Sequence, residues 1–203
     1  QNYDRHYRES GAERWQVPID QVKDLHLDRL PRWINRLQPG AHILDAGCAT
    51  GYLLSLLWDA GYENLAGVEL SRQLAISARQ NLPDSVIIEI SDIRDFLLHT
   101  TDGTYDLIFI HHVLEHLSRE YTIPLLREFH RCLAPGGYLS IKVPNASFLL
   151  AGNHCFGDFT HVVHFNERSL PQVLEAAGFD TRKLEFILHP PMLFWSWRRP
   201  GRA

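Results

Sequence analysis

The sequence predicts an α/β fold in which a doubly wound, mostly parallel sheet is flanked by helices. Five apolar segments with strand character recur between residues 42 and 143, and segments with helical periodicity separate them. Turn residues punctuate the alternation, as Gly61 does after the first helix and Pro135 before the fifth strand. This alternation favours a parallel sheet, because successive parallel strands need crossover connections and helices supply them.

The predicted strands are short and mostly apolar, which is typical of strands buried on both faces of a sheet. They are His42–Ala46, Leu65–Leu70, Val86–Ile90, Tyr105–Ile110 and Tyr138–Val143, with Leu184–Leu188 as the last clear strand. The predicted helices carry apolar residues at helical spacing. They are Gly51–Ala60, Ser71–Asn81 with Ser71 as its N-cap, Ile93–Leu98, Tyr121–Cys132 and Glu167–Ala177.

Three parts are expected along the chain. Residues 1–40 are predicted to form a helical cap, with a helix over Ile19–Leu37 that Pro39-Gly40 ends. Residues 41–190 form the ligand-binding domain, with a long irregular insert at 144–165, and long ordered loops are often functional. Residues 191–203 are expected to be a tail that fits a final strand poorly and is truncated.

Composition excludes several classes of protein. The net charge is −4, from 20 basic and 24 acidic residues, which gives no general attraction to nucleic acid. Three scattered cysteines are too few for a disulfide framework and indicate a reducing, cytoplasmic compartment. No apolar run approaches the roughly 20 residues of a membrane span, and no signal peptide opens the chain. Nothing in the composition fixes the oligomeric state.

The most informative segment joins the first strand to the first helix and reads I-L-D-A-G-C-A-T-G from Ile43 to Gly51. Glycines at 47 and 51 permit left-handed backbone and let a ligand approach the main chain. The helix that follows offers unpaired N–H groups at the same place. The segment therefore predicts a turn that binds a nucleotide-like ligand, although an ordinary strand–turn–helix joint is the alternative. A dinucleotide fingerprint would need glycines at 49 and 52, where the chain has Ala49 and Tyr52.

The pattern D-x-G-x-A-x-G resembles motif I of the class I S-adenosylmethionine (SAM) methyltransferases, whose fold is Rossmann-like. Ala49 stands where that motif usually has its middle glycine. The resemblance implies that Asp45 lies near the amino-acid end of SAM. It also implies that Gly47, Cys48, Ala49 and Gly51 lie against the methionine portion.

Acidic residues close the next two predicted strands, as the same family would have them. Glu69 ends the second strand, where a carboxylate can accept both ribose hydroxyls. Asp92 follows the third strand, where the family places an acid against the adenine amino group, with Ile93 packed on the ring. Leu70 and His111, at the ends of the second and fourth strands, complete the predicted cofactor site. The start of the fourth strand, Y-D-L-I, and the L-A-P-G-G turn before the fifth also resemble this family.

A second constellation follows the fourth strand and reads H-V-L-E-H over 112–116. H-x-x-E-H is also the inverzincin peptidase pattern, but that pattern requires a long helix as its context. The segment resembles the E-x-x-E-H of small-RNA 3′-terminal 2′-O-methyltransferases and, less closely, of ubiquinone-pathway O-methyltransferases. In the RNA enzymes these side chains and a later histidine hold a divalent metal that binds two ribose hydroxyls. The resemblance implies the ligands His112, Glu115, His116 and, from the insert, His164, with His112 in place of the first glutamate.

Three interpretations of these histidines stay open. A metal held by imidazoles and a carboxylate would be Zn, Mn, Fe or Ni rather than Mg. Without a metal, His112, His116 or His161 is the candidate general base, because an imidazole titrates near neutral pH. Structural roles in the loop and the insert are the third interpretation. The D-F-T-H segment that ends at His161 loosely resembles bacterial methyltransferases of sugar and polysaccharide biosynthesis, which implies that His161 lies near the transferred methyl group.

These patterns together predict a SAM-dependent methyltransferase that acts on a hydroxyl of a small-molecule or glycan acceptor. An alcohol needs a base or a metal to remove its proton, whereas an amine needs only its lone pair, so the histidines favour O-methylation. One alternative is a metal-dependent RNA 2′-O-methyltransferase, which the arginines of the tail support and the net charge of −4 opposes. The other alternative is a SAM-binding pseudoenzyme that acts as a partner protein.

Overall fold

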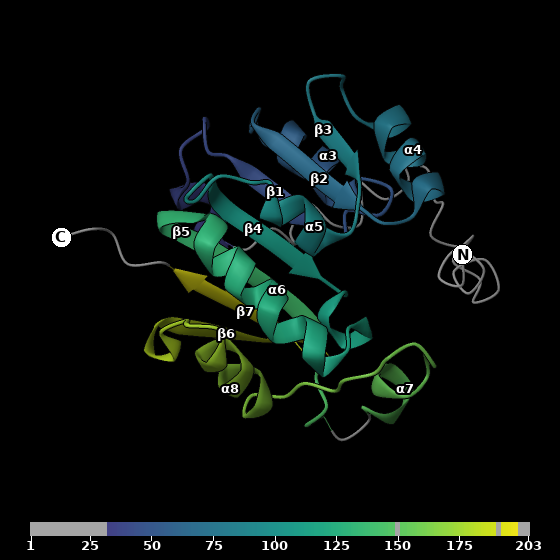
Figure 1. Ribbon diagram of the computed structural model, residues 1–203, viewed down its shortest axis with the longest axis vertical. Coiled ribbons are helices and arrows are strands. Elements are labelled where there is room, and N and C mark those ends of the chain that lie inside the picture. The colour runs from purple at the N-terminus through teal and green to yellow at the C-terminus, as the bar shows by residue number, and fades with distance from the viewer. Residues whose placement is uncertain (1–31, 149–150, 190–191, 199–203) are drawn as a thin grey trace. The chain divides into compact units, whose positions relative to one another are not determined.

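The computed structural model describes residues 32–148, 151–189 and 192–198. The chain divides into two compact units, Gln1–Ile93 and Arg94–Ala203. Both units combine parallel β-strands with helices, as the sequence predicts (Figure 1). Within the described ranges, no helix combines the length and the apolar character that crossing a membrane requires.

The first unit is built on three parallel strands in the order β3-β2-β1. These are β1 (Ile43–Ala46), β2 (Leu65–Glu69) and β3 (Ile87–Ile90). Helix α3 (Tyr52–Asp59) connects β1 to β2, and α4 (Arg72–Asn81) connects β2 to β3. Figure 1 shows the three strands side by side. Each prediction for these strands and helices is confirmed, with ends that shift by a residue or so.

Local sequence explains these elements. All four residues of β1 are buried, as expected for an apolar strand inside a parallel sheet. Ser71 caps α4, where its side chain accepts a hydrogen bond from the Leu74 N–H at 3.4 Å. The predicted helix over Ile19–Leu37 lies mostly outside the described residues, and its described end is the 3₁₀ helix η3 (Arg32–Arg36).

The second unit contains two parallel strands, β4 (Tyr105–His111) and β5 (Leu133–Pro144). Its further elements are α5 (Ile93–Leu98), which begins at the last residue of the first unit, η4 (Leu114–His116), α6 (Arg119–Cys132), α7 (Gly152–Cys155), α8 (Ser169–Ala176), η5 (Thr181–Lys183), β6 (Leu184–His189) and β7 (Met192–Arg198). The Pro-Gly-Gly predicted as a turn lies inside β5, where the register with β4 is irregular. The irregularity absorbs the turn residues without ending the strand.

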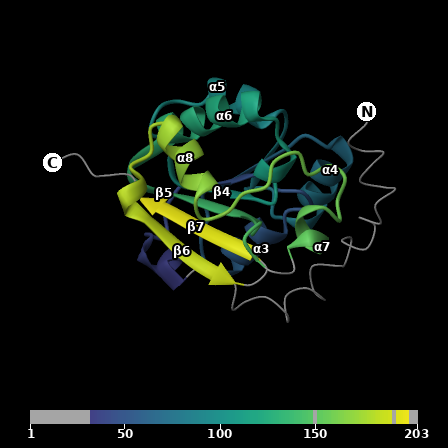
Figure 2. The ribbon, with the colours of Figure 1, turned by 90° about the horizontal axis from the view of Figure 1, so that it is seen from below.

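The prediction that the tail fits a strand poorly is wrong. Strand β7 pairs antiparallel with β5 on one side and with β6 on the other, and Figure 2 shows the three strands side by side. The segment M-L-F-W-S-W-R is rich in aromatic residues, which favour strands. Two antiparallel strands can be joined by a short hairpin, whereas parallel strands need a crossover helix. The alternation of strands and helices in the sequence therefore gives no sign of β7.

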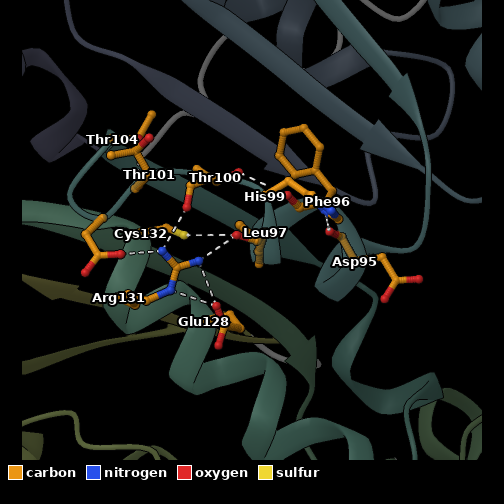
Figure 3. A network of polar contacts seen from close by, with 11 residues as sticks. Asp95, Phe96, Leu97, His99, Thr100, Thr101, Thr104, Glu128, Arg131 and Cys132 are labelled. Atoms are coloured by element: carbon orange, nitrogen blue, oxygen red, sulfur yellow. Dashed lines mark hydrogen bonds and ion pairs between the residues drawn. The ribbon is translucent and has the colours of Figure 1, made fainter.

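Arg131, near the end of α6, fastens that helix to the end of α5 (Figure 3). Its guanidinium donates to the carbonyl oxygens of Leu97 at 2.6 Å and Thr100 at 2.8 Å. It also donates to the carboxylates of Glu128, at 2.8 Å, and Asp102. The bond to Asp102 raises the pKa of Arg131 further, so the group stays charged. The network satisfies carbonyl groups that the end of a helix leaves unpaired, and it fixes the chain just before β4.

Candidate active site

The turn after β1 has repeated left-handed backbone. The φ angles are 89° at Gly47, 47° at Ala49 and 80° at Gly51, and Gly51 is the N-cap of α3. Glycine adopts such angles without strain, whereas an alanine there costs free energy. This backbone turns the chain sharply at the carboxyl end of β1, and the first-turn N–H groups of α3 lie directly after it.

Two buried carboxyl groups, those of Asp45 and Glu69, lie at this turn. Glu69, at the end of β2, is 6% exposed, and each of its oxygens accepts a backbone hydrogen bond: Oε2 from the Ala49 N–H at 3.0 Å and Oε1 from the Ser71 N–H at 2.8 Å. Burial and the charge of Glu69 raise the pKa of Asp45 to about 7. Burial, followed by the charges of both acids, also raises the pKa of Cys48, which therefore stays a thiol. The turn is thus held by Glu69 and lined by a carboxyl group that titrates near neutrality.

The other predicted cofactor residues of the first unit lie at the same edge of its sheet. The strands are parallel and in register, with Asp45 opposite Gly67 and Glu69 opposite Ile90, so their carboxyl ends coincide. Leu70 is 57% exposed there, an unusual position for a large apolar side chain. Asp92 is half-buried and Ile93 is buried, both directly after β3.

His111 ends β4 in the second unit. Its Nε2 lies 3.1 Å from the Ser140 hydroxyl, and its ring packs edge-on against Phe109. Burial lowers the pKa of His111 well below its ordinary value, and the charges of His112 and Lys142 lower it further. His111 is therefore a neutral hydrogen-bonding group at physiological pH.

The H-V-L-E-H segment after β4 is not an α-helix. His112 has a φ angle of 56°, and η4 is a single 3₁₀ turn. The peptidase interpretation needs a long helix here and is therefore excluded. The Nδ1 of His112, whose side chain is 46% exposed, lies 3.4 Å from the Oε1 of Glu115, which is 2% exposed.

The backbone of Glu115 holds the insert. Its carbonyl oxygen accepts hydrogen bonds from the N–H groups of Val162 at 2.7 Å and Val163 at 3.1 Å. The base of the insert is closed by a bridge between Asn145 and Phe165, where the Ala146 N–H donates to the Phe165 oxygen at 2.9 Å. The described part of the predicted insert, residues 144–148 and 151–165, thus carries α7 and is tied to η4.

His116 and His161 meet beside Glu115. Their ring centroids lie 4.7 Å apart, and one potential ligand atom each from Glu115, His116 and His161 fall within 4.8 Å of one another. The Nδ1 of His116 lies 2.9 Å from the Thr160 hydroxyl, and the Nδ1 of His161 lies 3.0 Å from the Cys155 carbonyl oxygen. Burial lowers the pKa of His116, although the charge of Glu115 opposes the shift. Three acceptor groups therefore converge, and at least His116 is neutral at physiological pH.

This grouping differs from the predicted ligand set. The sequence pointed to His112, Glu115, His116 and His164, whereas the group of three contains His161 and neither His112 nor His164. The ring of His164 packs instead on Phe156, with centroids 4.4 Å apart. The D-F-T-H-V-V-H segment offers two histidines three residues apart, and no helical or strand period tells which one turns inward. Sequence reasoning also missed the orienting roles of Thr160 and Asp158, although it singled out the segment that holds them.

Comparison with known proteins shows similarity to methyltransferases. A solved structure described as a SAM-dependent methyltransferase from Archaeoglobus fulgidus aligns over 95% of this chain and all of its own, with a TM-score of 0.76 and 20% identity. A ubiquinone biosynthesis O-methyltransferase of Xanthomonas campestris pv. campestris is 27% identical, over 94% of this chain and 84% of its own. A trans-aconitate 2-methyltransferase of an Acidovorax species is 32% identical, over 51% of this chain and 38% of its own.

The fold is therefore that of the class I SAM-dependent methyltransferases. The methyltransferase-domain family matches residues 16–184, and the chain belongs to that family. The chain spans about half the length of several curated relatives it matches, with 56% of one and 38% of another.

Proposed function

We propose that the protein binds SAM in the first unit and transfers its methyl group to a hydroxyl oxygen of a small-molecule or glycan acceptor. The observation that carries the proposal is the convergence of three proton-accepting groups, Glu115 and His116 of η4 and His161 of the insert. Ligands of doubly wound sheets bind beyond the carboxyl ends of the strands, and within its own unit each of η4 and the turn after β1 follows such a strand end.

The cofactor half of the proposal rests on the two buried acids. Each oxygen of Glu69 accepts one backbone N–H, and a carboxylate at the end of β2 is the type of group that accepts ribose hydroxyls in dinucleotide-binding folds, so we assign it to the ribose of SAM. Asp45, when ionised, suits the ammonium group at the amino-acid end. Exposed Leu70 offers an apolar surface to the nucleoside, and Asp92 with Ile93 suits the adenine.

The chemistry explains why the histidines matter. In the transfer the bond from sulfur to the methyl carbon breaks as the bond from the acceptor oxygen forms, so sulfur keeps the electron pair and the oxygen must lose its proton. A positioned imidazole can take that proton, and such a base typically contributes a factor of about 10²–10⁴. An amine acceptor would need no such group, which favours oxygen. Two relatives carry O-methylation or a carboxylic acid in their names, which agrees with an oxygen acceptor.

The test is a transfer assay with methyl-labelled SAM and fractionated cell extract as the acceptor source. We expect label in a small-molecule or oligosaccharide fraction with the wild-type chain. His116→Ala should lose transfer by at least a hundredfold while binding SAM within about threefold of wild type, because the proposal assigns His116 to the acceptor proton and not to the cofactor. The control is His99→Ala, because the His99 ring bonds the Asp95 carbonyl oxygen far from η4 in sequence.

Full activity of His116→Ala would remove the histidines from the reaction. Label that appears in RNA rather than in small molecules would replace the acceptor class. SAM binding without transfer to any fraction would favour a binding protein over an enzyme.

A further inference from the structure

We propose that Asp158 and Thr160 of the insert are positioning residues for His116, an inference that rests on the proposed function, in which an imidazole takes the acceptor proton. The two residues hold the proton of the neutral His116 ring on Nδ1 and leave Nε2 as the atom that accepts. They also distinguish His116 from its neighbour His161 as the base.

A chain of hydrogen bonds leads from the ring of His116 to a carboxylate. The Nδ1 of His116 lies 2.9 Å from the hydroxyl oxygen of Thr160, and that oxygen lies 2.6 Å from Asp158 Oδ1. The Thr160 N–H, at 2.9 Å, donates to the same carboxylate oxygen and steadies it. The chain crosses from η4 to the insert beside the Glu115 carbonyl oxygen, where two N–H groups of the insert already bond. The backbone therefore holds both ends of the chain in place.

The direction of each hydrogen bond follows from what its members can donate. Burial opposes the shift, but the two hydrogen bonds from Thr160 bring the pKa of Asp158 below its ordinary value, so its carboxylate is ionised and can only accept. A hydroxyl has one proton, and that of Thr160 goes to Asp158. The hydroxyl oxygen then accepts from His116, which requires the ring proton on Nδ1. In the neutral ring the lone pair is therefore on Nε2.

Glu115 is a second carboxylate beside His116, but it does not orient the ring. One of its oxygens lies within 4.8 Å of a ring nitrogen of His116, yet among the described residues neither oxygen accepts a hydrogen bond. Its charge acts on the whole ring, because Coulomb attraction depends on distance alone. The hydrogen bond to Thr160 depends on direction and selects one nitrogen.

His161 is held by a different kind of partner, although its ring centroid lies only 4.7 Å from that of His116. Its Nδ1 lies 3.0 Å from the Cys155 carbonyl oxygen, which can only accept, so this ring also carries its proton on Nδ1. A carbonyl is neutral, whereas the chain from His116 ends in a negative charge. A carboxylate that orients a histidine also stabilises the imidazolium that forms when the ring takes a proton. This difference favours His116 over His161 as the base.

In the proposed step, the acceptor hydroxyl gives its proton to Nε2 of His116 as its oxygen bonds the methyl carbon. The bond from that carbon to sulfur breaks, and sulfur keeps the electron pair. The ring then carries protons on both nitrogens and a positive charge, with the Nδ1 proton still bonded to Thr160. Asp158 stays ionised throughout, and the extra proton leaves Nε2 for water before the next turnover.

The first test locates the proton without any need for transfer. Two-bond ¹H–¹⁵N NMR spectra of the full chain, labelled at histidine and assigned with His116→Gln, report which ring nitrogen is protonated. We expect Nδ1–H at His116 in wild type and in Thr160→Ser, which keeps the hydroxyl. Thr160→Val removes the hydroxyl, so the His116 ring should gain the Nε2–H form.

The second test measures the rate of methyl transfer from labelled SAM to the extract fraction that takes up label. Thr160→Val should lower the rate by about thirtyfold or more and Asp158→Asn by about tenfold, with SAM affinity within about threefold. Thr160→Ser should stay within about threefold of wild type. Thr104→Val is the matched control and should do the same, because the Thr104 hydroxyl bonds the Thr101 carbonyl oxygen instead.

A double variant separates positioning from a merely structural role. If Thr160 acts through His116, adding Thr160→Val to His116→Ala should slow transfer by less than about twofold further. A second loss as large as the first would overturn the inference, and so would Nε2–H at His116 in wild type. Wild-type rates in Thr160→Val beside an inactive His116→Ala would overturn this inference and leave the proposed function. Full transfer by His116→Ala would overturn both.

Discussion

Two buried glutamates, one in each unit, show how the same side chain can serve two purposes. Glu69 is 6% exposed and each of its oxygens accepts a backbone N–H, so it organises the turn after β1. Glu115 is 2% exposed, yet among the described residues its oxygens accept no hydrogen bond. The difference shows that burial alone does not assign a role to a carboxylate. A buried carboxylate that accepts hydrogen bonds supports the fold, whereas one that accepts none lowers the stability of the protein, and a bound ligand can offset that loss.

The two side chains are also held differently. Glu69 is fixed through its carboxylate, which bonds Ala49 and Ser71. Glu115 is fixed through its main-chain oxygen, which two N–H groups of the insert share. Substitution of the side chain should therefore disturb the backbone at Glu69 and spare it at Glu115.

The largest effect is expected from Glu69→Met. Methionine keeps the bulk but leaves the N–H groups of Ala49 and Ser71 without these acceptors, so the free energy of unfolding should fall by about 2–4 kcal/mol. SAM affinity should fall at least tenfold, because the ribose hydroxyls lose their acceptor. Urea denaturation of the ligand-free protein and calorimetry with SAM measure the two effects. A variant that keeps both values would show that Glu69 holds neither the turn nor the cofactor.

The same substitution at the other glutamate should have the opposite sign. Glu115→Met removes a buried carboxylate that lacks hydrogen bonds, so the metal-stripped protein should gain about 1–3 kcal/mol in free energy of unfolding. SAM affinity should stay within about threefold of wild type. The same denaturation experiment, run beside Glu69→Met in metal-free buffer, checks it. A loss of stability comparable to that of Glu69→Met would show that Glu115 is a structural residue.

The comparison of the two units can be extended to the pH dependence of stability, which Asp45 of the first unit should control. Burial and the charge of Glu69 raise its pKa from 3.8 to about 7, so between these values the folded state holds a proton that the unfolded state has released. The stability contributed by Asp45 is full below pH 3.8 and is lost as the pH rises through about 7. Asp45→Asn should therefore lose less stability than wild type between pH 5 and pH 8, which thermal melts at several pH values measure.

SAM binding should show the reverse trend in the wild-type protein, because the ammonium group of SAM needs the ionised carboxylate. Affinity should rise several-fold from pH 6 to pH 8 in wild type and stay flat in Asp45→Asn. A flat profile in both proteins would remove Asp45 from the cofactor site.

The smallest effect is expected at Ala49, where φ is 47°. Ala49→Gly relieves the left-handed strain, partly offset by the greater freedom of glycine in the unfolded chain, so a gain of about 0.5–1 kcal/mol is expected. Differential scanning calorimetry resolves such a change. Destabilisation would mean that the alanine methyl group makes a contact that outweighs the strain.

Sequence periodicity predicted most of the fold because most elements obey local rules. Strand β1 is short and apolar apart from Asp45, and α4 begins after a serine that caps it, so both could be placed to within a residue or so. Strand β7 could not be placed, since its pairing depends on β5 and β6, which lie far along the chain or across a hairpin.

The same distinction between local rules and long-range contacts applies to the candidate site. The acid after each strand and the glycines of the turn are tied to strand ends, so the sequence could bring Asp45 and Glu69 to one edge. The choice between His161 and His164 depends on an irregular loop, and the relay through Thr160 depends on side-chain rotation. Neither feature produces a regular spacing of residue types, so neither could be predicted from the sequence.

The most direct test is a calorimetric titration of SAM into three metal-free proteins: wild type, Glu69→Met and Glu115→Met. We expect wild type and Glu115→Met to bind one equivalent with affinities within about threefold, and Glu69→Met to bind at least tenfold more weakly. Equal binding by all three proteins would contradict the assignment of the cofactor to Glu69 and the first unit. A loss confined to Glu115→Met would contradict the assignment of Glu115, whose oxygens accept no hydrogen bond among the described residues, to a task separate from SAM binding.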